Sequence, residues 1–345
     1  MTLPAVQADA RRGDLACTIL RYGPAAAALA YPLLLLCLHR SGQQLVDSTT
    51  ASAKLSAGLG VGIAAALILC VPLLGFVAIW RSADQLRARR LAHLAFAAPP
   101  LFTVVGVLFF LLGIPNGDYG LWAVAWVGAL AYAARRSLPS RMPTAPPAGW
   151  VRTAHGLSAG VMLGAFLLWH LANHVVAAWS LDQNKGAMEA LRLWYRSDLV
   201  QPVLVALFAW QFASGLRLLW AKLPPAGDIY SSIQTATAAY LAIYIPSHLI
   251  AVFILGRWFL AVDTTFAWAS GAPTGLLLDP WNVRLIPHYS LAVLFLISHL
   301  AVGLRGVLLG HGIRATTADR ATWTICTVGL AISLVIMVVQ LHVGS

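Results

Sequence analysis

Long apolar runs separated by short polar segments dominate this chain. The runs lie at about residues 24–38, 57–80, 91–113, 120–134, 154–180, 199–221, 233–256, 286–309 and 322–343. Helices of this length cross the roughly 30 Å hydrocarbon core of a bilayer. The pattern predicts an all-α integral membrane protein with about nine transmembrane helices. Because the first and fourth runs are short, eight is the alternative.

Composition supports a bilayer as the solvent of the chain. Of 345 residues, 59% are hydrophobic and only 10% are charged, and the mean hydropathy is +0.77. Soluble globular domains do not have this composition. The net charge of +11 has an uneven distribution: with a cytoplasmic N-terminus, 16 of the 23 Lys and Arg residues fall on the cytoplasmic side. This positive-inside pattern is typical of a multi-pass protein of a bacterial-type inner membrane. The positive charge is therefore expected to orient the protein in the membrane and to attract anionic lipid rather than nucleic acid.

Two absences in the sequence narrow the chemistry. The four cysteines form no CxxC or CxxCH motif, so neither covalent haem nor an iron–sulfur cluster is indicated. All twelve Asp and Glu residues fall outside the predicted spans. Ion-driven transporters use buried carboxylates as relays. A transport cycle of that kind is therefore not expected.

Four polar side chains lie deep inside apolar runs of the second half: His170, Gln211, His248 and His299. At about 1.5 Å per residue, His170 and His248 lie roughly 25 and 24 Å from the cytoplasmic face. Gln211 and His299 each lie roughly 18 Å below the outer face, which is a deeper level. Ionisable residues inside a membrane are costly and usually functional.

Two imidazoles at one depth on facing helices can ligate haem iron from both sides, as in an electron-transferring b-type haem. The sequence therefore predicts His170 and His248 as an axial pair. His174, one turn after His170, is the alternative ligand. Three further histidines near helix ends are expected to meet water, propionates or lipid phosphates: His155, His288 and His311.

The second half resembles a known family. The segments RTAHGLSAGVMLGAFLLWHLANH, the loop NKGAMEALRLWYRSDLVQP, WQFASGLRLLW, IQTATAAYLAIYIPSHL and DPWNVRLIPHYSLAVLFLISHLAVGLRGVLLGHGI follow one another. Together they are similar to the five-helix cytochrome b anchor of succinate dehydrogenases and fumarate reductases. The resemblance covers about residues 150–343 and rests on helix order and ligand spacing.

The resemblance implies roles for matching positions. His170 and His248 match ligands of the haem farther from the cytoplasm, and His299 matches one ligand of the nearer haem. Arg152, His155 and Ser158 match a polar helix entrance close to haem propionates and quinone. The place of the second nearer-haem ligand holds Gln211, and an amide is a poor iron ligand. We therefore expect one haem b per chain, with His299 as a possible ligand of a second.

These observations predict two regions, 1–140 with four spans of unknown role and 141–345 as a five-helix cytochrome b-like domain. The expected function is electron exchange between haem and a membrane quinone, with separate soluble cytoplasmic redox subunits as partners. No catalytic residue is assigned. Gln211 or the Arg152–His155–Ser158 cluster could bind the quinone. The alternatives are a haem- or quinone-binding sensor or assembly protein, and a transporter with structural histidines.

Overall fold

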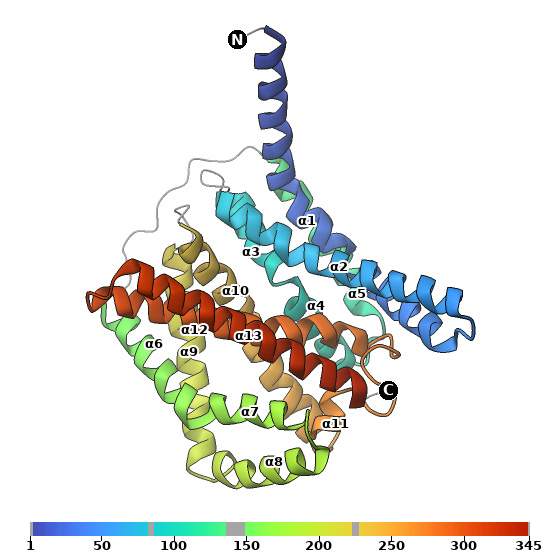
Figure 1. The fold of residues 1–345 in the computed structure, drawn as a ribbon, viewed down its shortest axis with the longest axis vertical. Coiled ribbons are helices and arrows are strands. Elements are labelled where there is room, and N and C mark those ends of the chain that lie inside the picture. The colour runs from blue at the N-terminus through green and yellow to red at the C-terminus, as the bar shows by residue number, and fades with distance from the viewer. Residues whose placement is uncertain (1–2, 82–85, 136–148, 223–227, 344–345) are drawn as a thin grey trace. The chain divides into compact units, whose positions relative to one another are not determined.

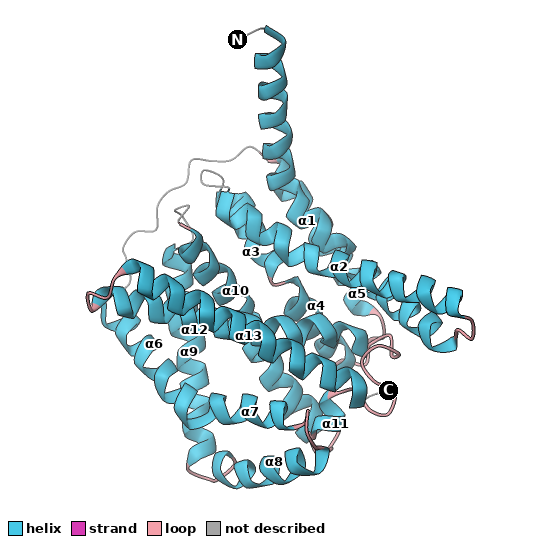
Figure 2. Ribbon diagram, in the orientation of Figure 1, coloured by secondary structure: helices cyan, strands magenta, loops and turns pink. Residues whose placement is uncertain are grey.

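A computed structural model describes residues 3–81, 86–135, 149–222 and 228–343, and within these ranges it contains helices and no strands (Figure 2). The all-helical prediction is confirmed there. Seven described helices are long and apolar enough to span a membrane: Leu15–Asp47, Ala51–Arg81, Gly149–Val176, Val200–Ala221, Ile229–Phe259, Asn282–Gly310 and Ala315–Val343.

The difference from the predicted nine spans lies in the first half. The run at 91–113 forms two helices, α3 (Leu86–Phe96) and α4 (Ala98–Leu111), which are bent by 68° at their junction. Pro99 and Pro100 begin α4, and proline lacks an N–H and disfavours helical backbone in the residue before it. The described count becomes eight if this pair is one span. The run at 120–134 forms α5 (Gly117–Ala134), whose 18 residues do not qualify as a span.

The chain divides into two compact units, Met1–Met142 with Leu223–Tyr240, and Pro143–Lys222 with Leu241–Ser345. This division resembles the predicted boundary near residue 140, except that 223–240 group with the first unit. Tyr240 is fully buried in the first unit, where its ring packs edge-on against Phe96 at 6.1 Å. Aromatic packing of this kind stabilises helix contacts in addition to the area that it buries.

The first unit is built on a hairpin of α1 (Leu3–Asp47) and α2 (Ala51–Arg81), with α3 packed against α2 (Figure 1). Gly75 of α2 allows close approach, because a Cβ there would lie 2.7 Å from the backbone nitrogen of Phe96. Small residues serve this purpose where apolar helices meet in a membrane. The indole of Trp122 on α5 donates a 2.7 Å hydrogen bond to the carbonyl of Ala28 on α1.

The second unit contains five of the candidate spans. The first combines α6 (Gly149–Met162), η1 (Leu163–Leu167) and α7 (Leu168–Val176). The others are α9 (Val200–Lys222), α10 (Ile229–Leu249, shared with the first unit) continued by η2 (Ile250–Phe259), α12 (Leu285–Gly310) and α13 (Ala315–Val343). The short helices α11 (Phe266–Ala269) and η3 (Asn282–Arg284) precede α12.

Most of the segment expected as a loop between the first two spans of this unit is helical. Helix α8 (Leu181–Tyr195) begins at Ser180, whose hydroxyl accepts a hydrogen bond from the backbone of Gln183 at 3.3 Å. A serine in this position satisfies a backbone donor at the helix start. The indole of Trp194 donates to the carbonyl of Ala165 at 3.3 Å, so α8 is tied to the first span.

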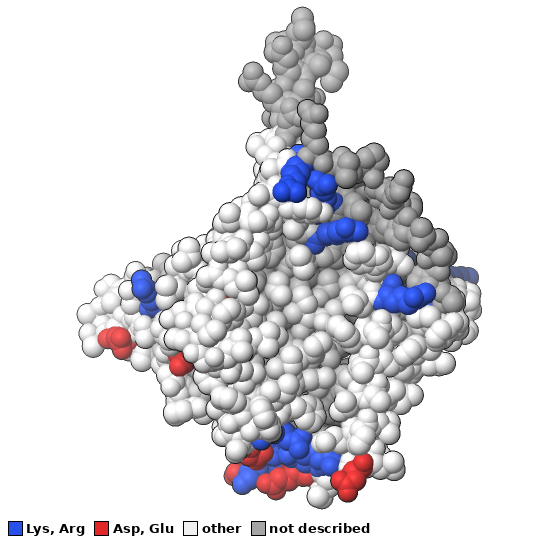
Figure 3. Space-filling model, turned by 180° about the vertical axis from the view of Figure 1, so that it is seen from behind, with Lys and Arg blue, Asp and Glu red and all other residues white. Residues whose placement is uncertain are grey.

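Charges differ between the two ends of the second unit. At the end where α8 lies, acidic and basic side chains are mixed (Figure 3). This end has five basic residues, Lys185, Arg192, Arg196, Arg257 and Arg284, and five acidic ones, Asp182, Glu189, Asp198, Asp263 and Asp279. The described residues at the opposite helix ends include five arginines, Arg152, Arg217, Arg305, Arg314 and Arg320, and two carboxylates, Asp228 and Asp319. The excess of positive charge therefore lies opposite α8.

Candidate functional site

His170 on α7 and His248 on α10 face each other inside the second unit. Their ring centroids are 6.2 Å apart, with an angle of 66° between the ring planes. The two side chains come from different candidate spans and are separated by 78 positions in the sequence. The expectation that they share a depth agrees with this geometry. Their ligation of iron stays a prediction.

Each of these histidines stacks on an aromatic ring four residues earlier in its own helix. Phe166 lies 5.1 Å from His170 at an angle of 17°, and Tyr244 lies 5.7 Å from His248 at 13°. Residues four apart share one face of a helix. The stacking holds both imidazoles against their helices and limits their rotation. The spacing of an aromatic residue four positions before each histidine is visible in the sequence, and it is the signal from which this stacking could have been predicted.

Both histidines also lie next to π-helical backbone. The segment Leu163–Leu167 ends three residues before His170, and Ile250–Phe259 begins two residues after His248. A π-helical turn displaces the register and leaves carbonyls free, and such turns are frequent at functional sites. Near His170, the indole of Trp169 donates to the carbonyl of Gly164 at 2.9 Å. No feature of hydrophobic periodicity predicted these segments.

Two further histidines belong to the same cluster. The ring of His174 lies 4.9 Å from that of His170 and 5.7 Å from that of Phe266. Its Nδ1 is buried and has no hydrogen-bond partner among the described residues. His288, which we expected at a polar helix end, is instead buried, with its ring 4.6 Å from Tyr244. The position of His288 near a helix end in the sequence did not indicate that it belongs to this cluster of histidines.

The residues of this cluster fit a haem with two axial imidazoles. Two metal–imidazole bonds of about 2.0–2.1 Å on opposite sides of one iron place the ring centres roughly 6 Å apart, and the observed separation is 6.2 Å. His170 and His248 would be the residues that hold the haem iron. The described residues contain no group of three or more His, Cys, Asp or Glu that could hold a metal ion on its own.

Gln211 makes interhelical hydrogen bonds that the sequence did not predict. Its Nε2 donates to the carbonyl of His155 at 2.9 Å and to Oγ of Ser158 at 2.6 Å. Nδ1 of His155 lies 2.8 Å from Oγ of Ser214 on α9. These contacts join α6 to α9 and bring Gln211 next to His155 and Ser158, two of the three residues of the expected Arg152–His155–Ser158 cluster. Arg152 is exposed.

These contacts correct one expectation about Gln211. We considered its amide hydrogens as donors to a quinone carbonyl, but both acceptors in the structure belong to α6. His299 lies half-buried on α12, eleven residues after His288. That spacing corresponds to about 16 Å along the helix axis. His299 therefore lies about three turns along α12 from His288, and its predicted place at a deeper level than the His170–His248 pair stays a prediction.

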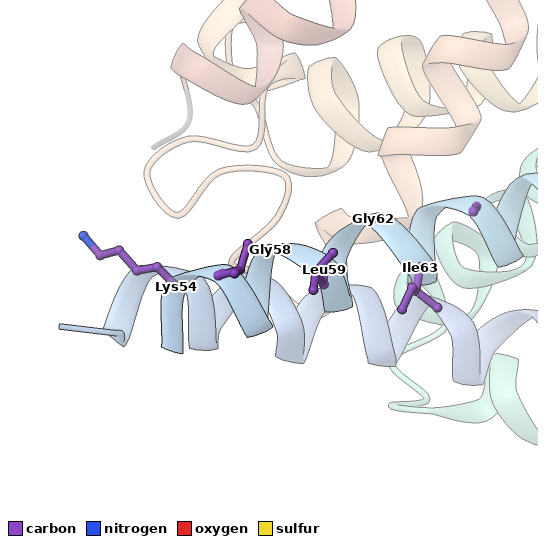
Figure 4. Close-up of a pocket in the computed structure, with 7 residues that line it drawn as sticks. Lys54, Gly58, Leu59, Gly62 and Ile63 are labelled. Atoms are coloured by element: carbon purple, nitrogen blue, oxygen red, sulfur yellow. The ribbon is translucent and has the colours of Figure 1, made fainter. Parts of the chain in front are cut away.

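A groove of about 450 Å³ lies on α2, in the first unit (Figure 4). Lys54, Leu59 and Ile63 line it, with Gly58 and Gly62 between them. Its walls are aliphatic, and Lys54 is the one titratable residue among those that line it. The groove has the shape of a lipid-facing surface, but none of the residues that line it is suited to electron or proton transfer.

No family model, no curated protein and no solved structure matches this chain. The fold alone therefore defines the class, which is an all-helical, multi-pass membrane protein.

Proposed function

We propose that this protein is a membrane b-type cytochrome that exchanges electrons between a haem and a membrane quinone. The observation that carries the proposal is the pair of facing imidazoles, His170 and His248, 6.2 Å apart on two candidate spans. When bound, haem would supply reversible one-electron chemistry. The protein's part is to hold the two imidazoles, exclude water from them and provide an apolar lining.

The surroundings of the pair support this role. Phe166 and Tyr244 stack on the two histidines and orient them. Phe208 and Tyr195 pack edge-on against Phe166 at 5.9 and 5.4 Å, which extends an aromatic lining around the pair. Apolar and aromatic walls suit the faces of a porphyrin, and they influence redox potential by restricting solvent.

The remaining parts of the proposal concern orientation and partners. The excess of arginine opposite α8 supports a cytoplasmic location for that end, which puts His170 and His248 in the outer half of a bacterial-type inner membrane. Soluble cytoplasmic redox subunits would be the partners. Because the hydrogens of Gln211 are already donated within the protein, a quinone near the inner level would use Arg152 or His155 for its carbonyl oxygens.

The test begins with the absorption spectrum of the purified, dithionite-reduced protein. We expect the bands of a low-spin b-type haem, and one haem per chain in a pyridine haemochrome assay. His170→Ala and His248→Ala should each remove the low-spin signal. His39→Ala in the first unit is the matched control and should retain it. A normal spectrum in both ligand variants would exclude this pair and direct attention to His174, which His174→Ala then tests.

A second measurement separates the electron-transfer function from its alternatives. Short-chain quinols should reduce the oxidised haem rapidly, and the corresponding quinones should reoxidise it. A protein that binds haem but reacts with no quinol would be a haem sensor or assembly factor. A protein with no haem would leave the transporter alternative, in which the histidines are structural.

A further inference from the structure

Three arginines gather at the α8 end of the second unit: Arg192, Arg196 and Arg257. Arg192 holds the segment after η2, since its Nη1 lies 2.8 Å from the carboxylate of Asp263 and its Nη2 donates to the carbonyl of Thr264 at 3.0 Å. Arg192 is thus largely committed to a structural role. Asp263 is the carboxylate paired with this group.

The other two guanidiniums make hydrogen bonds to neutral acceptors. Arg196 donates to the hydroxyl of Thr264 at 3.4 Å, and Arg257 donates to the amide oxygen of Gln201 at 3.3 Å. Burial, followed by the neighbouring charges of Arg192 and Arg257, lowers the pKa of Arg196 from its ordinary value. Within this cluster, three guanidiniums therefore face one paired carboxylate, that of Asp263, although the whole α8 end is balanced in charge. Such a cluster is suited to an anion with two or more oxygens.

The cluster is connected to the histidine pair on two sides. Tyr195, the neighbour of Arg196, packs edge-on against Phe166, which stacks on His170. Thr264, which contacts both Arg192 and Arg196, comes two residues before Phe266, whose ring lies 5.7 Å from that of His174. Arg257 follows His248 by nine residues on the same continuous span. At about 1.5 Å per residue, Arg257 therefore lies roughly 13 Å from His248 along the helix axis, and Phe166 and Tyr195 connect His170 to the Arg196 side of the cluster.

We infer that Arg196 and Arg257 bind the propionate carboxylates of the haem held by His170 and His248. The inference rests on the proposed function. The two propionates leave one edge of a porphyrin, so charges gathered at one end of the histidine pair match their distribution. The propionates would then point toward the α8 end of the unit, and Arg192 would position the segment that carries Thr264.

The test compares haem with a form that lacks the two charges. Full-length haem-free protein in phosphatidylcholine nanodiscs is titrated with haemin and with haemin dimethyl ester, and binding is followed by the Soret band. The unmodified protein should prefer haemin. Arg196→Gln and Arg257→Gln should each weaken haemin binding about three- to tenfold, as expected for charged hydrogen bonds that are partly exposed. Binding of the dimethyl ester should not change.

Matched variants keep the result interpretable. Arg196→Lys retains the charge and should restore most of the preference for haemin. Arg217→Gln, an exposed arginine at the opposite end of the unit, should leave both titrations unchanged. If Arg196→Gln and Arg257→Gln weaken both haems equally, or weaken neither, the propionate assignment is wrong.

The lipid phosphate of the bilayer is the rival anion for these arginines, so the thermal midpoint is also measured with and without phosphatidylglycerol. If the variants lose only the stabilisation by phosphatidylglycerol and keep their preference for haemin, the arginines bind lipid and the inference is overturned. If the unmodified protein binds neither haem, the proposed function itself fails, and the inference fails with it.

Discussion

Replacing Gln211 with leucine removes two of the hydrogen bonds that join α9 to α6. The Nε2 atom donates to the carbonyl of His155 at 2.9 Å and to the hydroxyl of Ser158 at 2.6 Å, and both acceptors lie on α6. Leucine has a similar volume and no polar atoms, so the substitution tests the hydrogen bonds more than the packing. The carbonyl of His155 still has its helical partner, whereas Ser158 loses a donor from the neighbouring span.

The expected loss of stability follows from the number of hydrogen bonds that the substitution removes. Interhelical hydrogen bonds in membranes contribute about 0.6 kcal/mol on average and up to about 1.7 kcal/mol. Two such bonds predict a loss of about 1–2 kcal/mol in the free energy of unfolding, or roughly five- to thirtyfold in the equilibrium constant. Part of this belongs to the Gln211–Ser158 contact, so Gln211→Leu and Ser158→Ala should be coupled by about 0.6 kcal/mol.

The assay is equilibrium unfolding in mixed micelles of increasing dodecyl sulfate content, for the two single variants and the double variant. Ser298→Ala is the matched control, because the hydroxyl of Ser298 donates within its own helix, to the carbonyl of Leu294 at 2.8 Å. It should cost less than Gln211→Leu and show no coupling to it. Strict additivity of Gln211→Leu and Ser158→Ala would refute the interhelical contact. An unchanged unfolding free energy in Gln211→Leu would refute the structural role of the amide.

Three other substitutions test the packing of each unit. Gly75→Leu should lower the unfolding free energy by about 1–3 kcal/mol, because a Cβ at this glycine would lie 2.7 Å from a backbone atom of α3. Gly62→Leu is the control and should change the unfolding free energy little, because a Cβ there would have no atom within 4 Å. Equal effects of the two substitutions would contradict the close approach of α2 and α3. Arg305→Gln removes a 2.7 Å ion pair with Asp319 and should cost about 0.2–1 kcal/mol, a difference that must shrink in high salt. Ser333→Ala removes a 2.6 Å bond to a backbone carbonyl of α12 and should cost about 0.6–1.7 kcal/mol; a midpoint equal to that of the unmodified protein would show that this bond contributes no net stability.

Local sequence was sufficient for the helical class and for most of the spans. The runs at 57–80, 199–221 and 286–309 correspond to helices Ala51–Arg81, Val200–Ala221 and Asn282–Gly310. An unbroken apolar stretch predicts a spanning helix because its backbone polar groups are satisfied only within the helix when no water is present. The first and last residues of each helix were less predictable, because the helices continue beyond the apolar region into polar sequence.

Counting along helices predicted a common depth for His170 and His248, whose rings lie 6.2 Å apart in the structure. Rise per residue is nearly constant, so depth can be calculated from sequence when the span ends are known. The stacking of Phe166 on His170 and of Tyr244 on His248 could also be predicted from sequence, because residues four apart lie on one face of a helix. Depth does not specify direction around the helix axis, so it could not decide whether the two rings face each other.

Packing between helices decided the rest. The partners of Gln211 lie more than 50 positions earlier in the chain, and His288 joins Tyr244 from a helix that begins about 40 positions later. In the π-helical turn before His170, the carbonyls of Gly164 and Ala165 accept hydrogen bonds from the indoles of Trp169 and Trp194, and the second of these comes from another helix. Hydrophobic periodicity describes how each helix is solvated. It contains no information on the rotation and register with which one apolar helix meets another, and these are set by side-chain shape and by a small number of polar contacts.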